Sequence, residues 1–366
     1  MKASLEEVFQ YLHDHAEISW KEHHTTDYIR SLFKKENCRI KAFDDITGLI
    51  IEIGSGKPVV ALRADMDALW QEVDGVFQAN HSCGHDAHMT IAIGVLWHFL
   101  EHKPPFEGTI RFLFQPAEEK GTGALALVEK GIMDDVDYLF GMHLRPIQEL
   151  EHGYFAPAIR HGAVRFVEGQ ITGEDAHGAR PHLNANAILI GTELFQHINN
   201  IHLDPKIPYS VKMTAFHAGG KNANIIPGNA AFSLDLRAQT NDIMEQLMKH
   251  VEKIASMLAD YHDVEIDLKV SSDVAAAVLH DSATNIMKEA IIECVGADML
   301  TDVITSTGGD DFHFYSIKRP HVNATMLAIG CDLQPGLHHP NMTFNHAAIP
   351  PSVRILTKAI EKALKQ

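Results

Sequence analysis

The chain has 366 residues, an apolar fraction of 45% and a formal net charge of −17 at pH 7. This length favours two domains, and this apolar fraction is enough for a large core. The acidic charge argues against nucleic acid and against anionic membrane surfaces as partners.

The cysteines and the N-terminus indicate a cellular compartment. The four cysteines are far apart and form no disulfide-framework spacing, which is typical of a reducing compartment. The first residues carry no apolar signal core, and no apolar run approaches the length of a membrane span. We therefore expect a cytoplasmic protein that has no membrane partner.

The first part of the chain alternates predicted helices and strands. Two helices are expected within residues 4–36, on either side of the polar segment 15–20. Apolar runs of strand length follow, and residues 54–58 are expected to form a hairpin turn. The predicted strands are Arg39–Phe43, Gly48–Ile53, Val59–Ala64, Thr109–Gln115 and Tyr138–Leu144. With helices predicted to end near His102 and Lys130, this order favours an α/β fold with a mostly parallel sheet covered by helices.

From about Ala163 the pattern changes to strand, helix, strand, strand, helix, strand, the order of an α+β ferredoxin-like unit. The predicted strands are Val164–Thr172, Tyr209–His217, Ala230–Ala238 and Val264–Val270, and the predicted helices are Ala185–Ile198 and Ile243–Leu258. The first domain then resumes with a helix, a strand and a closing helix, at Ser282–Cys294, Ala324–Ile329 and His346–Leu364. We expect a first domain at residues 1–164 and 275–366, with a second domain inserted at 165–274.

The stretch 81–88 carries four ligand-type side chains and an Asp. Cys83 and His85 alternate around Gly84, which lets the backbone turn tightly enough to direct both at one point. Thiolate and imidazole together suit a borderline-soft ion such as zinc. The alternative for this stretch alone is a buried cysteine beside solvated histidines.

Carboxylates follow two other predicted strands. Asp65 and Asp67 lie at the end of one strand, where open α/β sheets place their chemistry, although such residues also cap helices and turns. Glu118 and Glu119 follow the strand that ends at Gln115. Adjacent carboxylates after a buried strand are costly unless they are paired or bind a metal.

Five ligand-type residues lie beyond strands or in loops of the same domain, and a parallel sheet brings such positions together along one edge. They are Cys83, His85, Glu119, His143 and His338. Five ligands exceed the need of one tetrahedral zinc and suit two ions that share a bridging group. Glu118 is predicted to act as the general base that moves a proton from water to the leaving amine. The alternative is a surface glutamate in an acidic pair.

Six motifs occur together, in one order, over nearly the whole chain. They are Leu62–Leu69, Cys83–His88, Gln115–Glu119, Gly141–His143, His177–His182 and Leu337–Pro340. With these motifs the sequence resembles the amidohydrolase branch of the aminoacylase-type dinuclear metallopeptidases. That branch includes hippurate hydrolases, plant auxin-conjugate hydrolases and bacterial N-acyl amino acid deacylases. The bacterial subgroup of amidohydrolases fits best.

The resemblance implies the same five metal ligands and the same general base. It implies that Asp67 supports the ligands without being one of them. It also implies that the inserted domain is a lid through which two chains form a homodimer. His177 of this lid would steady the oxyanion, often in the partner's active site. Asn224 and Arg237 would face the substrate, where an arginine can hold a carboxylate through two hydrogen bonds.

The chain departs from the family pattern at three places. Trp70 replaces a proline after the Asp-Ala-Leu run, so we expect the adjoining loop to differ. His346 replaces an acidic residue after the last ligand motif, and residues 173–176 are more acidic than the glycine-rich form usual before the lid histidine. These changes bear on the substrate more than on the chemistry.

We therefore expect a metal-dependent hydrolase that cleaves the amide bond of small N-acyl amino acids, with an acetyl or aromatic acyl group. A metal-activated water would attack, with Glu118 as general base. The alternatives are a dipeptidase or carboxypeptidase with the same site, and a non-catalytic metal-binding homologue, which would not need Glu118. Two divalent ions per chain are expected. The soft sulfur of Cys83 favours zinc. The alternatives are manganese, cobalt or nickel, which would bind if they are the metals available to the protein.

Overall fold

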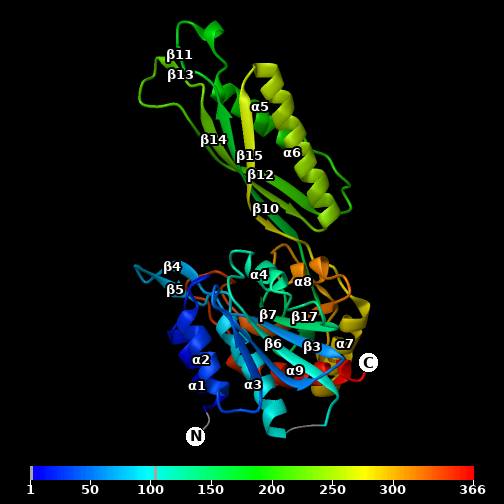
Figure 1. The fold of residues 1–366 in the computed structure, drawn as a ribbon. Coiled ribbons are helices and arrows are strands. Elements are labelled where there is room, and N and C mark those ends of the chain that lie inside the picture. The colour runs from blue at the N-terminus through cyan, green and yellow to red at the C-terminus, as the bar shows by residue number, and fades with distance from the viewer. Residues whose placement is uncertain (1–2, 103–104) are drawn as a thin grey trace. The chain divides into compact units, whose positions relative to one another are not determined.

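The computed structural model describes residues 3–102 and 105–366 (Figure 1). The described chain divides into two compact units. Unit 1 comprises the described parts of Met1–Arg160 together with Val278–Thr305 and Asp311–Gln366, and unit 2 comprises His161–Ala277 and Ser306–Asp310. Among the helices of the described ranges, none is both long and apolar enough to cross a membrane.

Unit 1 is built on a seven-stranded sheet in the order β1–β2–β6–β3–β7–β17–β8. Its strands are β1 (Arg39–Ala42), β2 (Leu49–Ser55), β3 (Val59–Asp65), β6 (Gly108–Gln115), β7 (Tyr138–Pro146), β8 (Phe155–Ala156) and β17 (Asn323–Leu333). The four central strands run parallel to one another, whereas β1, β2 and β8 are antiparallel to their neighbours. The predicted α/β class is confirmed, and the sheet is parallel only in its centre.

The turn at residues 54–58 does not close a hairpin, so that prediction was wrong. β6 lies between β2 and β3 and pairs with both, antiparallel to β2 and parallel to β3. The glycines and the proline mark a turn correctly. A pairing between distant parts of the chain decides which strand lies beside β2. Turn residues carry no information about this pairing.

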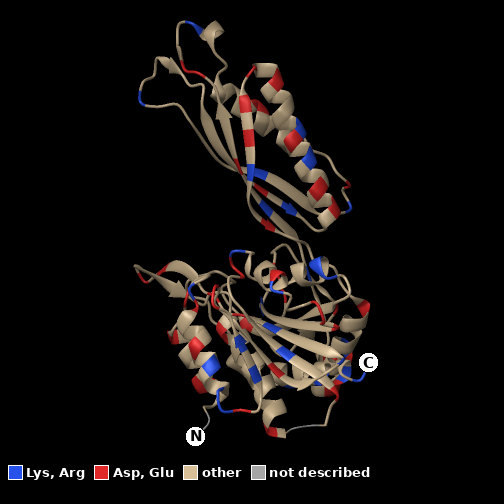
Figure 2. Ribbon diagram, in the orientation of Figure 1, with Lys and Arg blue, Asp and Glu red and all other residues tan. Residues whose placement is uncertain are grey.

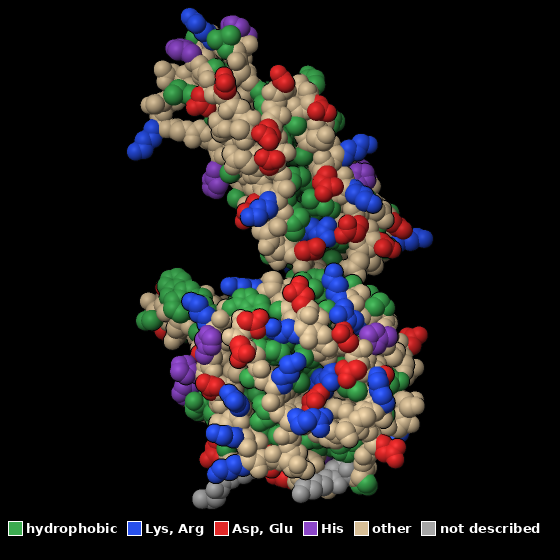
Figure 3. Space-filling view, in the orientation of Figure 1, with side chains coloured by type: hydrophobic (Ala, Val, Ile, Leu, Met, Phe, Trp, Pro, Cys, Tyr) green, Lys and Arg blue, Asp and Glu red, His purple; other side chains and the backbone are tan. Residues whose placement is uncertain are grey.

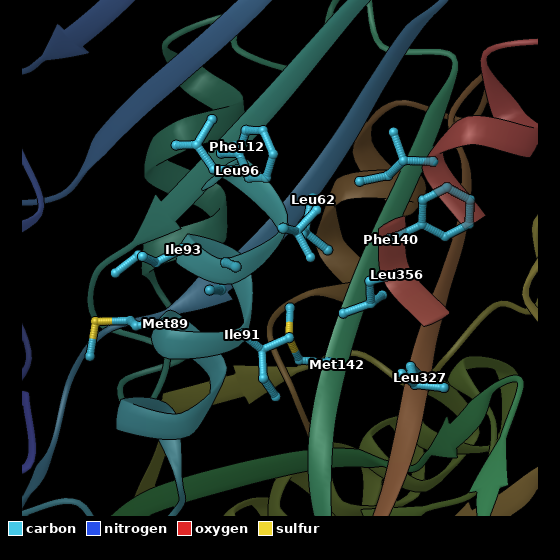
Figure 4. Close-up of a cluster of buried hydrophobic side chains, with 14 of the residues drawn as sticks. Leu62, Met89, Ile91, Ile93, Leu96, Phe112, Phe140, Met142, Leu327 and Leu356 are labelled. Atoms are coloured by element: carbon cyan, nitrogen blue, oxygen red, sulfur yellow. The ribbon is translucent and has the colours of Figure 1, made fainter. Parts of the chain in front are cut away.

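Helices pack against this sheet and enclose an apolar core. They are α1 (Leu5–Asp14), α2 (His23–Phe33), α3 (His85–His102), α4 (Gly123–Glu129), α7 (Asp281–Val295), α8 (His313–Lys318) and α9 (Ile349–Ala363). α3 is buried on nearly all sides, which explains why its sequence is apolar without a clear stripe. In Figure 4, side chains of α3 such as Ile91 and Leu96 meet Leu62 of β3, Phe112 of β6 and Met142 of β7.

A two-stranded hairpin leaves unit 1 where the sequence predicted only an altered loop after Trp70. Its strands are β4 (Leu69–Val73) and β5 (Val76–Asn80). Asp74 and Gly75 form the turn with φ of 50° and 83°, as expected of an Asp-Gly hairpin turn. Trp70, Val76 and Phe77 are each about three-fifths exposed. Exposed hydrophobic side chains gather at this hairpin in Figure 3.

Unit 2 has the predicted order of two strand–helix–strand halves. Its sheet is antiparallel, in the order β12–β14–β10–β15, and two helices pack on one face. The elements are β10 (Ala163–Thr172), α5 (Ala187–Asn199), β12 (Tyr209–Ala218), β14 (Ala230–Ala238), α6 (Asn241–His262) and β15 (Glu265–Val274). α6 buries Leu247, Val251 and Leu258, while its acidic and basic residues alternate along the opposite side (Figure 2).

Several short elements complete the chain. Strands β11 (Ala176–His177) and β13 (Ile225–Ile226) pair with each other, as do β9 (Ile159–His161) and β16 (Ile304–Ser306). The single-turn 3₁₀ helices are η1 (Pro181–Leu183), η2 (Ala297–Met299) and η3 (His346–Ala348). The last of these leads into α9, so the predicted closing helix begins with a 3₁₀ turn.

Candidate metal centre

The loop before α3 directs a thiol and an imidazole towards one point. Gly84 has a φ of +85°, and a Cβ there would lie 2.7 Å from Cδ1 of Leu144. Only glycine accepts this backbone conformation and this close approach without strain. α3 begins at His85, and both Cys83 and His85 are buried. The Sγ atom of Cys83 lies 3.6 Å from Nε2 of His143, which belongs to β7.

Backbone carbonyls fix the orientation of two imidazole rings. Nδ1 of His85 lies 2.8 Å from the carbonyl oxygen of Asp67, and Nδ1 of His143 lies 2.6 Å from that of Leu144. A carbonyl can only accept a hydrogen bond, so the proton of each neutral ring is on Nδ1. Nε2 of each ring keeps its lone pair and is the nitrogen available to a metal ion.

The five predicted ligands fall into two overlapping groups. Ligand atoms of Cys83, His85 and His143 lie within 4.8 Å of one another, and so do those of Cys83, Glu119 and His338. Cys83 belongs to both groups. Nε2 of His338 is 3.5 Å from Oε1 of Glu119, and the imidazole is about half exposed. The structure therefore brings all five side chains together, although His143 lies inside β7 and not beyond its end.

The site has the properties of a centre that needs a cation. Nε2 of His85 and Oε1 of Glu119 are buried and lack a hydrogen-bond partner among the described residues, which is rare for buried polar atoms. Burial raises the pKa of Glu119 to about 7, and burial and the charge of Glu119 raise the pKa of the Cys83 thiol well above its usual range. Thiolate, imidazole and carboxylate together fit a borderline-soft divalent ion, which would favour the deprotonated forms.

Two buried carboxylates hold the backbone around the predicted general base. Asp67 accepts hydrogen bonds from the N–H groups of Glu118 and Glu119, both at 3.0 Å. Glu22 accepts one from the N–H of Ala117, at 2.9 Å, and Ala117 has a φ of +53°. These hydrogen bonds from three successive N–H groups fix the backbone of residues 117–119. They thereby fix the position from which the side chains of Glu118 and Glu119 extend.

The carboxylate of Glu118 lies beside the ligands. Its Oε2 is 3.8 Å from Nε2 of His85, the nitrogen that is available to a metal, and its side chain is 10% exposed. A carboxylate in this position can reach a water molecule in the site. This is the geometry required of a proton acceptor.

A fully buried ion-pair network lies behind the site. Arg63 pairs with Asp65 and, at 2.9 Å, with Asp311, while Nδ1 of His88 lies 2.7 Å from Asp65. Nε2 of His88 accepts a hydrogen bond from the N–H of Leu144. Burial alone would raise the pKa of the Asp65 carboxyl, but the cationic groups around it, among them Arg63, hold that pKa well below its usual range. The network fixes the end of β3, two residues before Asp67, and the part of β7 that carries His143.

The predicted lid residues occupy two different places in unit 2. His177 lies in β11 and pairs with Ile225 of β13, and the N–H of Gly178 donates to the carbonyl of Asn224 at 2.7 Å. His177 and Asn224 are therefore neighbours. Arg237 lies at the far end of β14, and the stretch from Ala230 to Arg237 alone spans roughly 23 Å at about 3.3 Å per residue. The structure does not bring Arg237 near the other two.

Arg237 lines a pocket of about 410 Å³ inside unit 2. Its Nε donates to Asp235 at 2.8 Å, and its guanidinium lies 5.7 Å from the ring of Phe166. Lys212 and Tyr209 are also in the lining. The lining also includes the carboxylate of Asp235, and its two cationic side chains and one hydroxyl group suit a further anionic group such as a substrate carboxylate.

Sequence patterns did not reveal Glu22, Ser19 and Gln71. Glu22 is buried and accepts a hydrogen bond of 2.5 Å from Thr47, and Ser19 donates to Asp67 at 2.6 Å. The polar segment 15–20 between two helices was the available signal for Ser19. The Asp-Gly turn at 74–75 was the available signal for the hairpin that carries Gln71.

Comparisons with known proteins agree with this arrangement. The N-acetyl-L-cysteine deacetylase of Bacillus subtilis is 26% identical over 369 residues, covering 98% of this chain and 87% of that protein. The thermostable carboxypeptidase 1 of Saccharolobus solfataricus is 28% identical over 333 residues, covering 86% and 83%. The crystal structure of the YxeP protein of Bacillus subtilis, described as a dinuclear metal-binding peptidase, has a TM-score of 0.83 and 25% identity, with coverage of 99% and 98%.

The fold and the cluster of donors define a metal-dependent hydrolase. Residues 61–362 match the model of the Peptidase family M20/M25/M40, and the chain belongs to this family. The predicted resemblance to aminoacylase-type dinuclear metallopeptidases is thereby confirmed, as is the predicted enzyme class.

Proposed function

We propose that the protein hydrolyses the amide bond of N-acyl amino acids, with unit 1 as the catalytic domain and unit 2 as the lid. One observation carries the proposal. The carboxylate of Glu118 stands beside Nε2 of His85, at the edge of a buried cluster of thiol, imidazole and carboxylate groups. A structural metal site has no need of this additional base.

The division of roles follows from the two ligand groups. Cys83, His85 and His143 would hold one divalent ion, and Cys83, Glu119 and His338 would hold the other. Zinc suits the sulfur ligand best, and manganese, cobalt or nickel are the alternatives that availability would select. When bound, the ions supply Lewis acidity, which lowers the pKa of water and polarises the carbonyl group of the substrate.

Glu118 performs the proton transfers. It takes a proton from the attacking water as the oxygen bonds to the acyl carbon, and it delivers this proton to the nitrogen as the C–N bond breaks. The products are a carboxylate and a free amino acid. Asp67 and Glu22 keep the segment 117–119 in place during both transfers through the three backbone hydrogen bonds.

The lid supplies the remaining groups. His177 donates to the oxygen that becomes negative as the tetrahedral intermediate forms, and Asn224 stands beside it. Arg237, with Lys212, holds the carboxylate of the amino acid. One small substrate cannot span the length of β14, so His177 and Arg237 of the same lid serve different substrate molecules. In a symmetric dimer, each active site would take Arg237 from one chain and His177 from the other.

Unit 2 offers a surface for such a dimer. β12 is a terminal strand of its sheet, and α5, which packs over β12, leaves Ile188, Leu189 and Phe195 about half exposed. An open strand edge beside an apolar helix face can join its copy across a two-fold axis.

Phe195→Glu is expected to shift the protein from dimer to monomer, because the new charge would be desolvated at the centre of this face. Sedimentation analysis measures the change. Met257→Glu places the same charge at a half-exposed apolar position on α6, and we expect it to remain a dimer. Equal behaviour of the two variants would contradict the α5–β12 interface.

A substrate panel tests the proposed function. Acetyl-, benzoyl- and indoleacetyl-amino acids should be hydrolysed faster than dipeptides, and the amides of the same N-acyl amino acids, which lack the free carboxylate, should be poor substrates. A carboxypeptidase is the second candidate, because a carboxypeptidase is among the relatives. Faster cleavage of dipeptides or longer peptides than of every N-acyl amino acid would replace the first candidate by the second.

The cytoplasm is the proposed location. Cys38, Cys83, Cys294 and Cys331 are all free, and Cys83 must stay reduced to bind a metal ion. A reducing compartment meets this need.

A further inference from the structure

The hairpin β4–β5 is tied to two of the predicted ligand segments through one side chain. Oε1 of Gln71 accepts hydrogen bonds from Oγ of Ser82, at 2.7 Å, and from Nδ2 of Asn80, at 3.1 Å. Nε2 of Gln71 donates to the carbonyl oxygen of His338, at 2.8 Å. Ser82 directly precedes Cys83, so a single amide contacts the segments that carry Cys83 and His338.

His338 needs such support. Its φ is +64°, a conformation that side chains other than glycine seldom adopt. About half of its side chain is exposed, so packing alone does little to fix the imidazole. Its backbone is held on both sides, since its N–H donates to the carbonyl of Ser82 at 2.8 Å and its carbonyl accepts from Gln71. Asn80 adds a bond to the carbonyl of Pro340, at 3.0 Å, in the same loop.

The orientation of the Gln71 amide is determined by its partners. Its oxygen faces the amide donor of Asn80 and its nitrogen faces the carbonyl of His338, so a flipped amide would lose both of these bonds. A carboxylate of the same shape could keep both accepted bonds. It would, however, place an oxygen against the carbonyl oxygen of His338.

We propose that Gln71 is a positioning residue that sets the place of His338 and thereby the affinity of the ion that Cys83, Glu119 and His338 hold. The inference rests on the proposed dinuclear site. Residues that orient a metal ligand typically change metal affinity by about 10- to 100-fold when they are replaced. The effect of Gln71 falls mainly on this ligand group, because His85 and His143 of the other group are oriented by the carbonyls of Asp67 and Leu144. The other group is reached through Ser82, which precedes the shared residue Cys83.

The test is a zinc titration of the full-length protein against a competing chelator, with no need for turnover. In Gln71→Ala the ion that Cys83, Glu119 and His338 would hold should lose about 10- to 100-fold in affinity, and the affinity of the other ion should change much less. Gln71→Glu should lose at least as much, although it keeps the shape of the side chain. A purely structural role for Gln71 predicts the reverse order, with Glu milder than Ala.

Matched controls lie on the facing strand. Gln78 pairs with Gln71 in the hairpin, is exposed, and its side chain makes no hydrogen bond within the described part of the chain. Gln78→Ala and Gln78→Glu should bind both ions as the wild type does. Thermal unfolding of all four metal-free variants shows whether the fold is intact.

A double mutant identifies the route. If Gln71 acts through His338, then Gln71→Ala should cause no further loss of zinc affinity in a His338→Ala background. Additive losses, or unchanged affinities in Gln71→Ala, would overturn the inference while leaving the dinuclear site in place. A wild-type protein that binds one ion and is insensitive to His338→Ala would instead overturn the dinuclear site itself.

Discussion

Glu118→Gln is expected to fold and to bind metal like the wild type while losing about 10²–10⁴-fold in turnover, the usual contribution of a general base. Glutamine keeps the shape of the side chain and its backbone N–H still donates to Asp67. It cannot accept the proton from water, and so it cannot return one to the amine. Steady-state kinetics on the best N-acyl amino acid, with metal analysis of the same sample, measures both quantities.

Glu119→Gln is the matched control for this prediction. The two residues are adjacent, and Asp67 holds both backbones at the same distance. The expected result for Glu119→Gln is weaker metal binding, because a neutral amide replaces a ligand. Wild-type turnover in Glu118→Gln, together with full metal content in Glu119→Gln, would show that the two roles are wrongly assigned.

His177→Ala is expected to lower turnover by about 10²–10³-fold, the typical cost of removing one donor to the oxyanion. Metal content should not change, because His177 belongs to unit 2 and the proposed ligands belong to unit 1. The loop around His177 is anchored by the pairing of β11 with β13, so removing the side chain should leave this loop in place. Turnover equal to that of the wild type would contradict the proposed role of His177 as a donor to the oxyanion.

A mixing experiment decides which chain His177 serves. His177→Ala and His143→Ala proteins are each expected to be nearly inactive. If His177 acts on the partner's substrate, heterodimers of the two contain one complete site and should recover activity. Heterodimers that form but remain inactive would place His177 at the site of its own chain.

The clustering of the proposed metal ligands could be predicted because local sequence carries most of it. Cys83 and His85 sit around a glycine that the turn requires, and Glu119 follows a strand that is buried along its length. Once these strands are assigned to one parallel sheet, their ends must meet. Gly84 also explains why two of the proposed ligands, Cys83 and His85, can lie within the short stretch 81–88.

The residues that hold the ligands could not be predicted in this way. Glu22 reaches Ala117 and Gln71 reaches His338 across long stretches of chain, and both bonds exist only after the sheet and the loops are in place. The place of β6 between β2 and β3 was missed for the same reason. Single glutamates and glutamines of this kind have no pattern in sequence, since their partners are backbone groups of distant segments.

The most direct test of the account is the number of metal ions per chain. Protein purified without chelator, reloaded with zinc or manganese and freed of excess ion should contain two ions per chain by elemental analysis. Cys83→Ser should bind both ions more weakly, because Cys83 belongs to both proposed ligand groups and a hydroxyl group is a poorer ligand than a thiolate. A wild-type protein that saturates at one ion per chain would contradict the dinuclear site.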